Sequence, residues 1–190
     1  MASIILMGIK HCGKSTQAAL ISKKLNMPKY DTDDVVEKLS GKTPRELYVQ
    51  DGKKAFMEWE AKACLEIKSE LEERGGEAVI ATGGGICCND EAVAILKTLG
   101  RLVFLVADEK TAADRIVREA SFSPDGKLKD IPAYVAAKNP QSLDDVRKIF
   151  HDFYLERTEM YSRICDVAVR MEKVPKMQNA TRILKSMGIN

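Results

Sequence analysis

Residues 8–16 of the chain read Gly8-Ile9-Lys10-His11-Cys12-Gly13-Lys14-Ser15-Thr16. They match the pattern G-x-x-x-x-G-K-[ST], and they lie between an apolar run, Ile4–Met7, and a helix-prone segment, Lys14–Leu25. A strand before the motif and a helix after it are the context in which the pattern has a physical basis. Glycines let successive backbone N–H groups converge on phosphate oxygens at a helix N-terminus, where the helix dipole favours negative charge. The motif therefore predicts a nucleotide-binding P-loop.

The individual residues of this loop have separate expected tasks. The ammonium group of Lys14 is expected to reach the β- and γ-phosphates, and the hydroxyl of Ser15 to be a ligand of Mg²⁺. We expect the nucleotide to be bound by the following residues of the loop: Gly8, Cys12, Gly13, Lys14, Ser15 and Thr16.

Strands and helices alternate along the rest of the chain. Five short apolar or extended runs are predicted as strands, and helical segments separate them: Ile4–Met7, Pro28–Tyr30, Ala78–Ala81, Leu102–Val106 and Cys165–Val169. This alternation predicts an α/β fold with three layers, a doubly wound, mostly parallel five-stranded sheet in a single domain over residues 1–190. Between Ala120 and Pro140, prolines and polar residues interrupt the periodicity, which predicts an irregular, mobile lid at about residues 120–140.

The composition narrows the class of partner. The chain has 190 residues and a formal net charge of +2, so it lacks the excess of basic residues that nucleic-acid or anionic-membrane binding usually requires. Its longest apolar runs fall far short of the roughly 20 residues of a membrane helix. Five irregularly spaced cysteines fit reduced thiols better than a disulfide framework. We expect a cytoplasmic monomer that acts on a small molecule.

Two further motifs follow predicted strands. Asp31-Thr32-Asp33 comes at the end of the second strand, and Thr82-Gly83-Gly84-Gly85 at the end of the third, so both should open onto the P-loop. One carboxylate can hold Mg²⁺ and another can accept a proton from an attacking hydroxyl, while glycines let backbone amides approach a ligand. The alternative is that the aspartates cap a helix and the glycines form a plain loop.

The order of the motifs continues with G-x-x-x-F-x-x-x-E (Gly52, Phe56, Glu60), an Arg-containing helix before the lid, and R-x-x-x-Y (Arg157, Tyr161). In this order the sequence resembles the shikimate kinase family over nearly the whole chain. The resemblance implies a nucleoside-monophosphate-kinase-like fold, ATP as donor, Mg²⁺ as cofactor, and phosphorylation of a hydroxyl of a small molecule. Shikimate, converted to shikimate 3-phosphate, is the leading acceptor.

The resemblance also implies roles for particular residues. Asp31 would serve the metal together with Ser15, and Asp33 would bind the acceptor hydroxyls and act as the base. Arg115 would pack near the adenine. The acceptor would be bound by Asp33, by the glycines Gly83, Gly84 and Gly85, and by Arg157, which would face its carboxylate.

The sequence departs from the family at two positions where an arginine is expected. Met57 follows Phe56 where the family carries an arginine that helps to bind the shikimate carboxylate, and Ser123-Pro124 stands where the family lid opens with Arg-Pro. A thioether cannot replace a guanidinium fork, and the loss of a charge-assisted hydrogen bond usually costs ~1.5–3 kcal/mol. Lys127 or Lys129 are candidates to replace the lid arginine.

These departures leave two alternatives open. The first is a kinase of another small hydroxy acid, polyol or nucleotide-like acceptor, which Met57, Ser123 and an unusually long segment between Ser123 and Arg157 favour. The second is a nucleotide-binding regulatory module with weak transfer, which the presence of Lys14, Asp31 and Asp33 disfavours.

Overall fold

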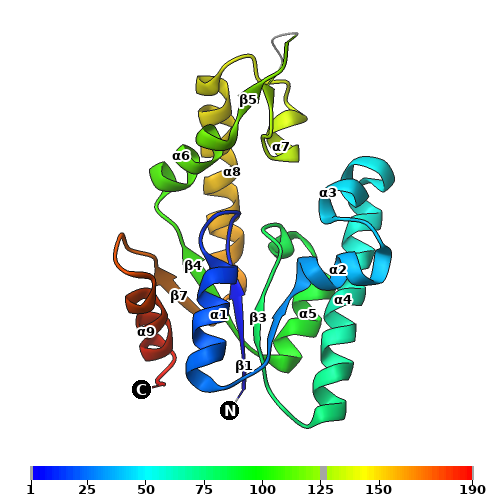
Figure 1. Cartoon of the computed structure of the whole chain (residues 1–190), viewed down its shortest axis with the longest axis vertical. Helices are drawn as coiled ribbons and strands as arrows, with labels where there is room; N and C mark the ends of the chain where they lie inside the picture. The colour runs from blue at the N-terminus through cyan, green and yellow to red at the C-terminus, as the bar shows by residue number, and fades with distance from the viewer. Residues whose placement is uncertain (1, 125–127, 190) are drawn as a thin grey trace.

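A five-stranded parallel sheet forms the centre of the molecule (Figure 1). The computed structural model describes residues 2–124 and 128–189. The strand order is β2-β3-β1-β4-β7, and every pairing between these strands is parallel. The strands are β1 (Ser3–Met7), β2 (Lys29–Asp31), β3 (Val79–Ala81), β4 (Gly100–Val106) and β7 (Val167–Arg170). All five predicted strands are therefore confirmed, with ends displaced by no more than two residues.

Helices cover both faces of the sheet, which confirms the predicted three-layer, doubly wound fold (Figure 1). Helices α1 and α9 pack on each other, whereas α5 and α8 both pack on β4. Two short turns, η1 (Leu47–Asp51, π-helical) and η2 (Ile86–Cys88, 3₁₀), complete the helical elements. The helices are α1 (Lys14–Leu25), α2 (Thr32–Ser40), α3 (Pro44–Glu46), α4 (Gly52–Arg74), α5 (Asp90–Leu99), α6 (Glu109–Glu119), α7 (Ala133–Ala136), α8 (Leu143–Ile164) and α9 (Lys176–Ser186).

Strand β1 lies at the centre of the hydrophobic core. All of its residues are buried, and Ile4, Ile5, Leu6 and Met7 have no exposed surface. A parallel strand with helices on both faces has no solvent-facing side, so its sequence is a continuous apolar run rather than an alternating one. This central position brings the loop after Met7 to the carboxyl edge of the sheet. In the part of the chain that the structure describes, no helix is long and apolar enough to cross a membrane.

The lid has more regular structure than the sequence predicted. It contains an antiparallel hairpin of β5 (Ser121–Phe122) and β6 (Leu128–Lys129), followed by α7. The prediction of an irregular segment was wrong here because strands of two residues are too short to leave a periodic signal. Ile131 and Val135 are buried in the main core, so the lid is anchored beside α8. Lys127 lies outside the described residues.

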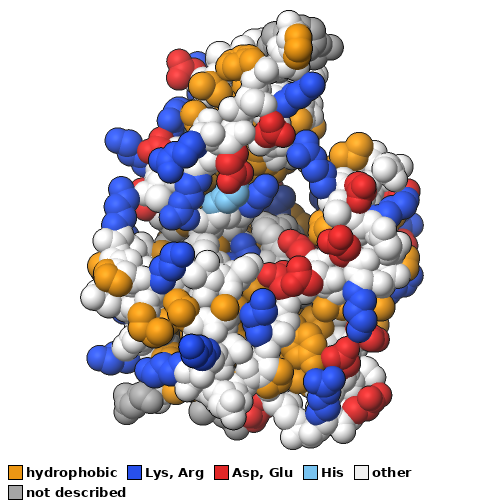
Figure 2. All heavy atoms as spheres, in the orientation of Figure 1, with side chains coloured by type: hydrophobic (Ala, Val, Ile, Leu, Met, Phe, Trp, Pro, Cys, Tyr) orange, Lys and Arg blue, Asp and Glu red, His pale blue; other side chains and the backbone are white. Residues whose placement is uncertain are grey.

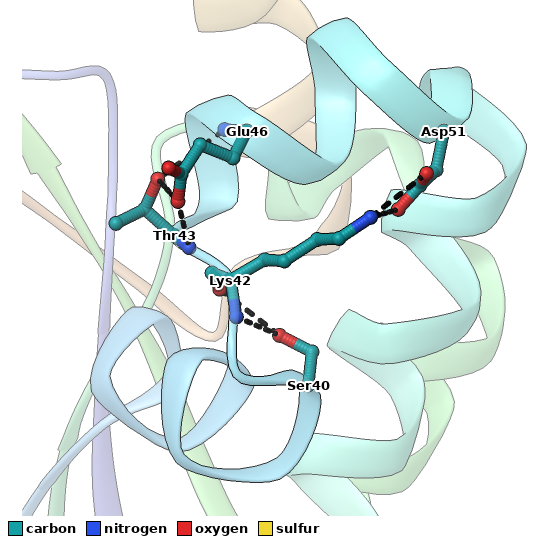
Figure 3. A network of polar contacts seen from close by, with 5 residues as sticks. All are labelled: Ser40, Lys42, Thr43, Glu46 and Asp51. Carbon is teal, nitrogen blue, oxygen red and sulfur yellow. Dashed lines mark hydrogen bonds and ion pairs between the residues drawn. The ribbon is translucent and has the colours of Figure 1, made fainter.

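A polar network shapes the segment between α2 and α4 (Figure 3). The Thr43 hydroxyl accepts a hydrogen bond from the Glu46 amide at 3.3 Å, and the Glu46 carboxylate accepts one from the Thr43 amide at 2.8 Å. These two hydrogen bonds form a capping box at the start of α3. Lys42 pairs with Asp51 at 2.7 Å and so joins the two ends of the α3–η1 segment. The pair holds this segment as a compact arm opposite the lid.

Strands β1 and β4 approach each other closely at Gly100, where a Cβ atom would lie 2.0 Å from the carbonyl oxygen of Ser3. We expect Gly100→Ala to lower the free energy of unfolding by about 1–3 kcal/mol, because the two strands must move apart. Urea denaturation measures this loss. Gly76→Ala is the matched control, because a Cβ atom at Gly76 meets no atom within 4 Å. Equal stability of the two variants would contradict the close approach.

Candidate functional site

A cavity of about 680 Å³, called here the main cavity, opens at the carboxyl edge of the sheet. It is lined by the P-loop, the ends of β2 and β3, the helices α4 and α8, and the lid. Figure 2 shows the hollow between the lid and the arm, with basic and acidic side chains around it. The basic side chains that line the main cavity are Lys10, Lys14, Arg45, Lys53, Arg115 and Arg157. Such a lining suits an anionic ligand.

The P-loop presents an uncapped helix N-terminus to this cavity. Gly13 precedes α1 with a φ of 100° and makes no side-chain cap, whereas Asp31, Asn89, Asp108 and Ser142 cap α2, α5, α6 and α8. The first N–H groups of α1 therefore have no side-chain acceptor, which is the arrangement that binds phosphate. The Lys14 ammonium donates to the carbonyl oxygens of Gly8 at 2.9 Å and Ile9 at 3.0 Å, so it lies over the loop.

Ser15 and Asp31 form a pair of oxygen ligands. The Ser15 hydroxyl donates to the Asp31 carboxylate at 2.8 Å, although the two residues come from α1 and β2. Mg²⁺ typically takes one or two such protein oxygens together with phosphate oxygens and water. The residues present therefore fit this ion. Within the described residues no group of three or more His, Cys, Asp or Glu side chains is placed to hold a metal, so a nucleotide would have to supply part of the coordination shell.

Asp31 and Asp33 differ in their surroundings. The second oxygen of Asp31 accepts a hydrogen bond from the Asp33 amide at 3.2 Å and caps α2, so the capping alternative holds for Asp31 alongside its contact with Ser15. Both aspartates line the main cavity. Burial, and next the negative charge of Asp31, raise the pKa of Asp33 to about 6, although Lys14 opposes the shift. A carboxylate with a pKa close to working pH is suited to general base catalysis.

The glycine loop packs tightly against these groups. A Cβ atom at Gly83 would lie 2.7 Å from an Asp33 carboxylate oxygen, and one at Gly84 would lie 2.9 Å from the Lys10 amide nitrogen. At Gly84 the neighbouring atom is backbone, so this position needs glycine, whereas at Gly83 a Cβ atom would have to displace the Asp33 carboxylate. A Cβ atom at Gly85 would meet nothing within 4 Å, although Gly85 also lines the main cavity.

Glu60 of α4 lines the main cavity next to Gly83 and is 1% exposed. Its Oε2 atom accepts a hydrogen bond from Asn89 at 3.0 Å, while Oε1 has no partner among the described residues. Burial is the largest cause that raises the pKa of Glu60 to about 7, and the Asn89 bond opposes it. Met57, which lines the cavity nearby, brings no charge to pair with Glu60. The sequence motif indicated Glu60, but its raised pKa follows from burial and from the nearby Asp33 and Cys88, which only the fold brings close to it.

Helix α8 brings Arg157 and Tyr161 to the site. The Tyr161 hydroxyl is buried within hydrogen-bond distance of the carbonyl oxygens of Gly84 (3.0 Å) and Gly8 (3.2 Å). The Arg157 guanidinium lies 4.9 Å from the ring centre of Phe153 and donates toward the sulfur atoms of Cys87 and Cys88. It lines the main cavity, and its Nε atom is buried without a partner in the described part of the chain.

A second cavity of about 430 Å³ lies on the other side of the P-loop. Arg115 of α6 lines both cavities and donates a hydrogen bond to the carbonyl oxygen of His11. Cys12 lines the second cavity rather than the main one, and Gly8 lines neither of the two. Gly8 instead shapes the loop, because its φ is 145° and its carbonyl oxygen accepts from Lys14.

A few residues of the main cavity carry no sequence motif. Arg45, Lys53, Tyr134 and Phe153 line it, but they belong to the arm, the lid and the middle of α8, where composition alone does not distinguish cavity residues from surface residues. Ser123, at the position of the expected lid arginine, is 8% exposed and does not line this cavity. Lys129 is exposed on the lid hairpin.

A model of the shikimate kinase family matches residues 10–188. The chain belongs to this family. A shikimate kinase of Aquifex aeolicus is 31% identical over 173 residues, which are 91% of this chain and 89% of that relative. The crystal structure of the Aquifex aeolicus shikimate kinase has a TM-score of 0.69 at 28% identity and covers 98% of this chain and 96% of that chain. A shikimate kinase from Acinetobacter baumannii in complex with shikimate shares the fold, with a TM-score of 0.77 at 21% identity, over 98% of this chain and 93% of that chain.

As a member of the shikimate kinase family the protein is a phosphotransferase with an alcohol group as acceptor. The family assignment also explains why the P-loop, the aspartates and the glycine loop meet at one edge of the sheet. Open α/β sheets bind their ligands outside the carboxyl ends of the strands, where these three motifs lie. Met57 brings no positive charge to the buried Glu60, so among the causes that act on this carboxyl group the cation that favours its charged form is Arg157.

The raised pKa of Asp33 predicts how stability depends on pH. Folding raises the pKa of this carboxyl from 3.8 to about 6, so the folded protein holds the proton more tightly than the unfolded chain. The stabilising contribution of the protonated group is present below about pH 4 and is lost as the pH rises through 6. We expect Asp33→Asn to match the wild type near pH 4 and to exceed it at pH 8 by about 2–3 kcal/mol.

Urea denaturation of both proteins at several pH values measures this difference. A constant difference between pH 4 and pH 8 would show that Asp33 is not held in its protonated form by the fold.

Proposed function

We propose that the protein transfers the γ-phosphoryl group of ATP to a hydroxyl of shikimate and forms shikimate 3-phosphate. The observation that carries this proposal is that the P-loop, the carboxylate of Asp33 and the glycine loop share one cavity in a member of the shikimate kinase family. The bound shikimate of the Acinetobacter baumannii relative supports shikimate as the acceptor.

In this proposal the nucleotide binds across the P-loop. The N–H groups of Gly13, Lys14, Ser15 and Thr16 hold its phosphates at the uncapped N-terminus of α1. The second cavity takes the base, where Arg115 of α6 and Cys12 of the P-loop contact it. Gly8 contributes by the turn that it allows.

Ser15 and Asp31 would hold Mg²⁺, which when bound neutralises negative charge on the β- and γ-phosphate oxygens. The 2.8 Å contact between the two side chains keeps both oxygens on one side of the loop. Lys14 adds positive charge from the other side, and it exchanges the carbonyl oxygens of Gly8 and Ile9 for phosphate oxygens when a nucleotide binds.

The acceptor lies between Asp33, the glycine loop and Arg157. Asp33 orients the reacting hydroxyl and takes its proton as the oxygen attacks the γ-phosphorus, while ADP leaves with the bridging electrons. Gly83, Gly84 and Gly85 let the acceptor approach the backbone. Arg157 binds the carboxylate of the acceptor through charge-assisted hydrogen bonds.

A single observation favours a second candidate function, the phosphorylation of another small hydroxy acid or polyol. Met57 lines the main cavity at the position of the expected arginine, so it offers an apolar contact where a carboxylate would need a donor. An acceptor with an apolar or uncharged group at that position would fit this side chain better than shikimate does.

ADP release tests the proposed reaction. With ATP, Mg²⁺ and millimolar shikimate, we expect turnover on the scale of ~1–100 s⁻¹ that depends on shikimate. Lys14→Ala is the blank, because it removes the phosphate-binding ammonium, and circular dichroism verifies that this variant is folded. Bound ATP with no stimulation by shikimate would overturn shikimate as the acceptor.

Met57→Arg separates the two candidate acceptors. If the pocket binds shikimate, the new guanidinium gains both the shikimate carboxylate and the buried Glu60 as partners, and KM for shikimate should fall about tenfold or more. Met57→Leu is the control, because it keeps an apolar side chain of similar size, and its KM should stay near that of the wild type. A higher KM for shikimate in Met57→Arg would favour an uncharged acceptor group.

A further inference from the structure

Tyr134 reaches the main cavity from the lid, on helix α7. Its ring stacks on Phe153 of α8, with 3.8 Å between ring centres and 12° between ring planes. Ile131 and Val135, on either side of Tyr134 in the chain, are 3% and 0% exposed. The side chain is therefore held in one place, although it belongs to a segment outside the sheet and its covering helices.

The hydroxyl of Tyr134 is buried and has no hydrogen-bond partner in residues 2–124 and 128–189. Buried phenol groups nearly always have such a partner, because the loss of water must be compensated. Nε of Arg157 and Oε1 of Glu60, two buried polar atoms of residues that line the same cavity, share this lack among the described residues. The three groups come from α7, α8 and α4, so they converge on the cavity from three elements.

The electrostatics of Tyr134 define which kind of ligand atom it can contact. Burial raises the pKa of its phenol group, so the group stays protonated and can donate a hydrogen bond, while the positive charge of Arg157 acts on it from nearby. A donor beside a guanidinium suits an anionic oxygen. The two oxygens of a carboxylate offer about four sites for hydrogen bonds, and a bidentate guanidinium group fills two of them, so a further donor can bind the same carboxylate.

We propose that Tyr134 donates a hydrogen bond to the carboxylate of the acceptor, beside Arg157, and thereby determines acceptor specificity. This inference rests on the proposed function, because it takes the acceptor to be a hydroxy acid. The inference also assigns the lid a role in binding the acceptor. A lid hydroxyl supplies part of the recognition that Met57 cannot supply from α4.

Tyr134→Phe tests the inference, because it removes the hydroxyl and keeps the stacked ring. We expect KM for shikimate to rise about tenfold and KM for ATP to stay unchanged. We expect the thermal unfolding midpoint to stay equal or to rise, because the lost hydroxyl has no partner in the empty protein. A structural role alone would not raise KM while it leaves stability intact.

Tyr154→Phe is the matched control. The Tyr154 hydroxyl donates to the carbonyl oxygen of Ala107 at 2.8 Å and does not line the main cavity. This variant should therefore lose stability and keep its KM for shikimate. An unchanged KM for shikimate in Tyr134→Phe would overturn the inference.

The carboxamide of shikimate tests whether the carboxylate is the group that Tyr134 contacts. The effect of Tyr134→Phe on KM should be smaller for this analogue than for shikimate. An equal effect on acid and amide would overturn the assignment to the carboxylate.

Calorimetric measurement of shikimate binding separates the inference from the proposed function. If the wild type binds shikimate without turnover, the proposed function fails and the dissociation constants of wild type and Tyr134→Phe still decide the inference. If the wild type does not bind shikimate, both fail.

Discussion

The hydroxyl of Tyr161 joins the parts of the molecule that make the site. It lies fully buried between the carbonyl oxygen of Gly8, where the P-loop begins, and that of Gly84 in the glycine loop. Its ring stacks on Phe104 of β4, with 5.0 Å between ring centres. One residue of α8 therefore sets the spacing of two loops that follow different strands. Because Arg157 is one turn away on the same helix, its position relative to the P-loop depends on the same contact.

A second constraint is the distribution of charge around Gly83. A Cβ atom at Gly83 would lie 2.7 Å from an oxygen of Asp33 and 3.1 Å from an oxygen of Glu60, and burial raises the pKa values of both carboxyl groups. A cation beside Glu60 would favour its charged form, but Met57 supplies none. The lining of the main cavity thus includes an acid that readily holds a proton, the guanidinium group of Arg157 and the phenol of Tyr134. This combination differs from the pair of arginines that the resemblance to the family predicts.

Local signals made most of the fold predictable. The P-loop motif and the apolar runs each depend on a few neighbouring residues, and both have the predicted structure. The lid was less predictable, because its strands have two residues each and its helix α7 has four. Elements of that length are stabilised by what they pack against, here the core contacts of Ile131 and Val135, rather than by their own periodicity.

The sequence alone determined the strand, loop and helix that can bind phosphate and the pair of aspartates at the end of β2. It also determined that position 57 is methionine rather than arginine. Each of these features depends only on residue type and spacing. Only the tertiary structure decided which groups face one another. It brought Ser15 within 2.8 Å of Asp31 and left Glu60 buried without a full set of partners. It also placed Tyr134 beside Phe153 in the main cavity. Burial and distance set pKa values and hydrogen-bond partners, and both arise from segments far apart in the chain.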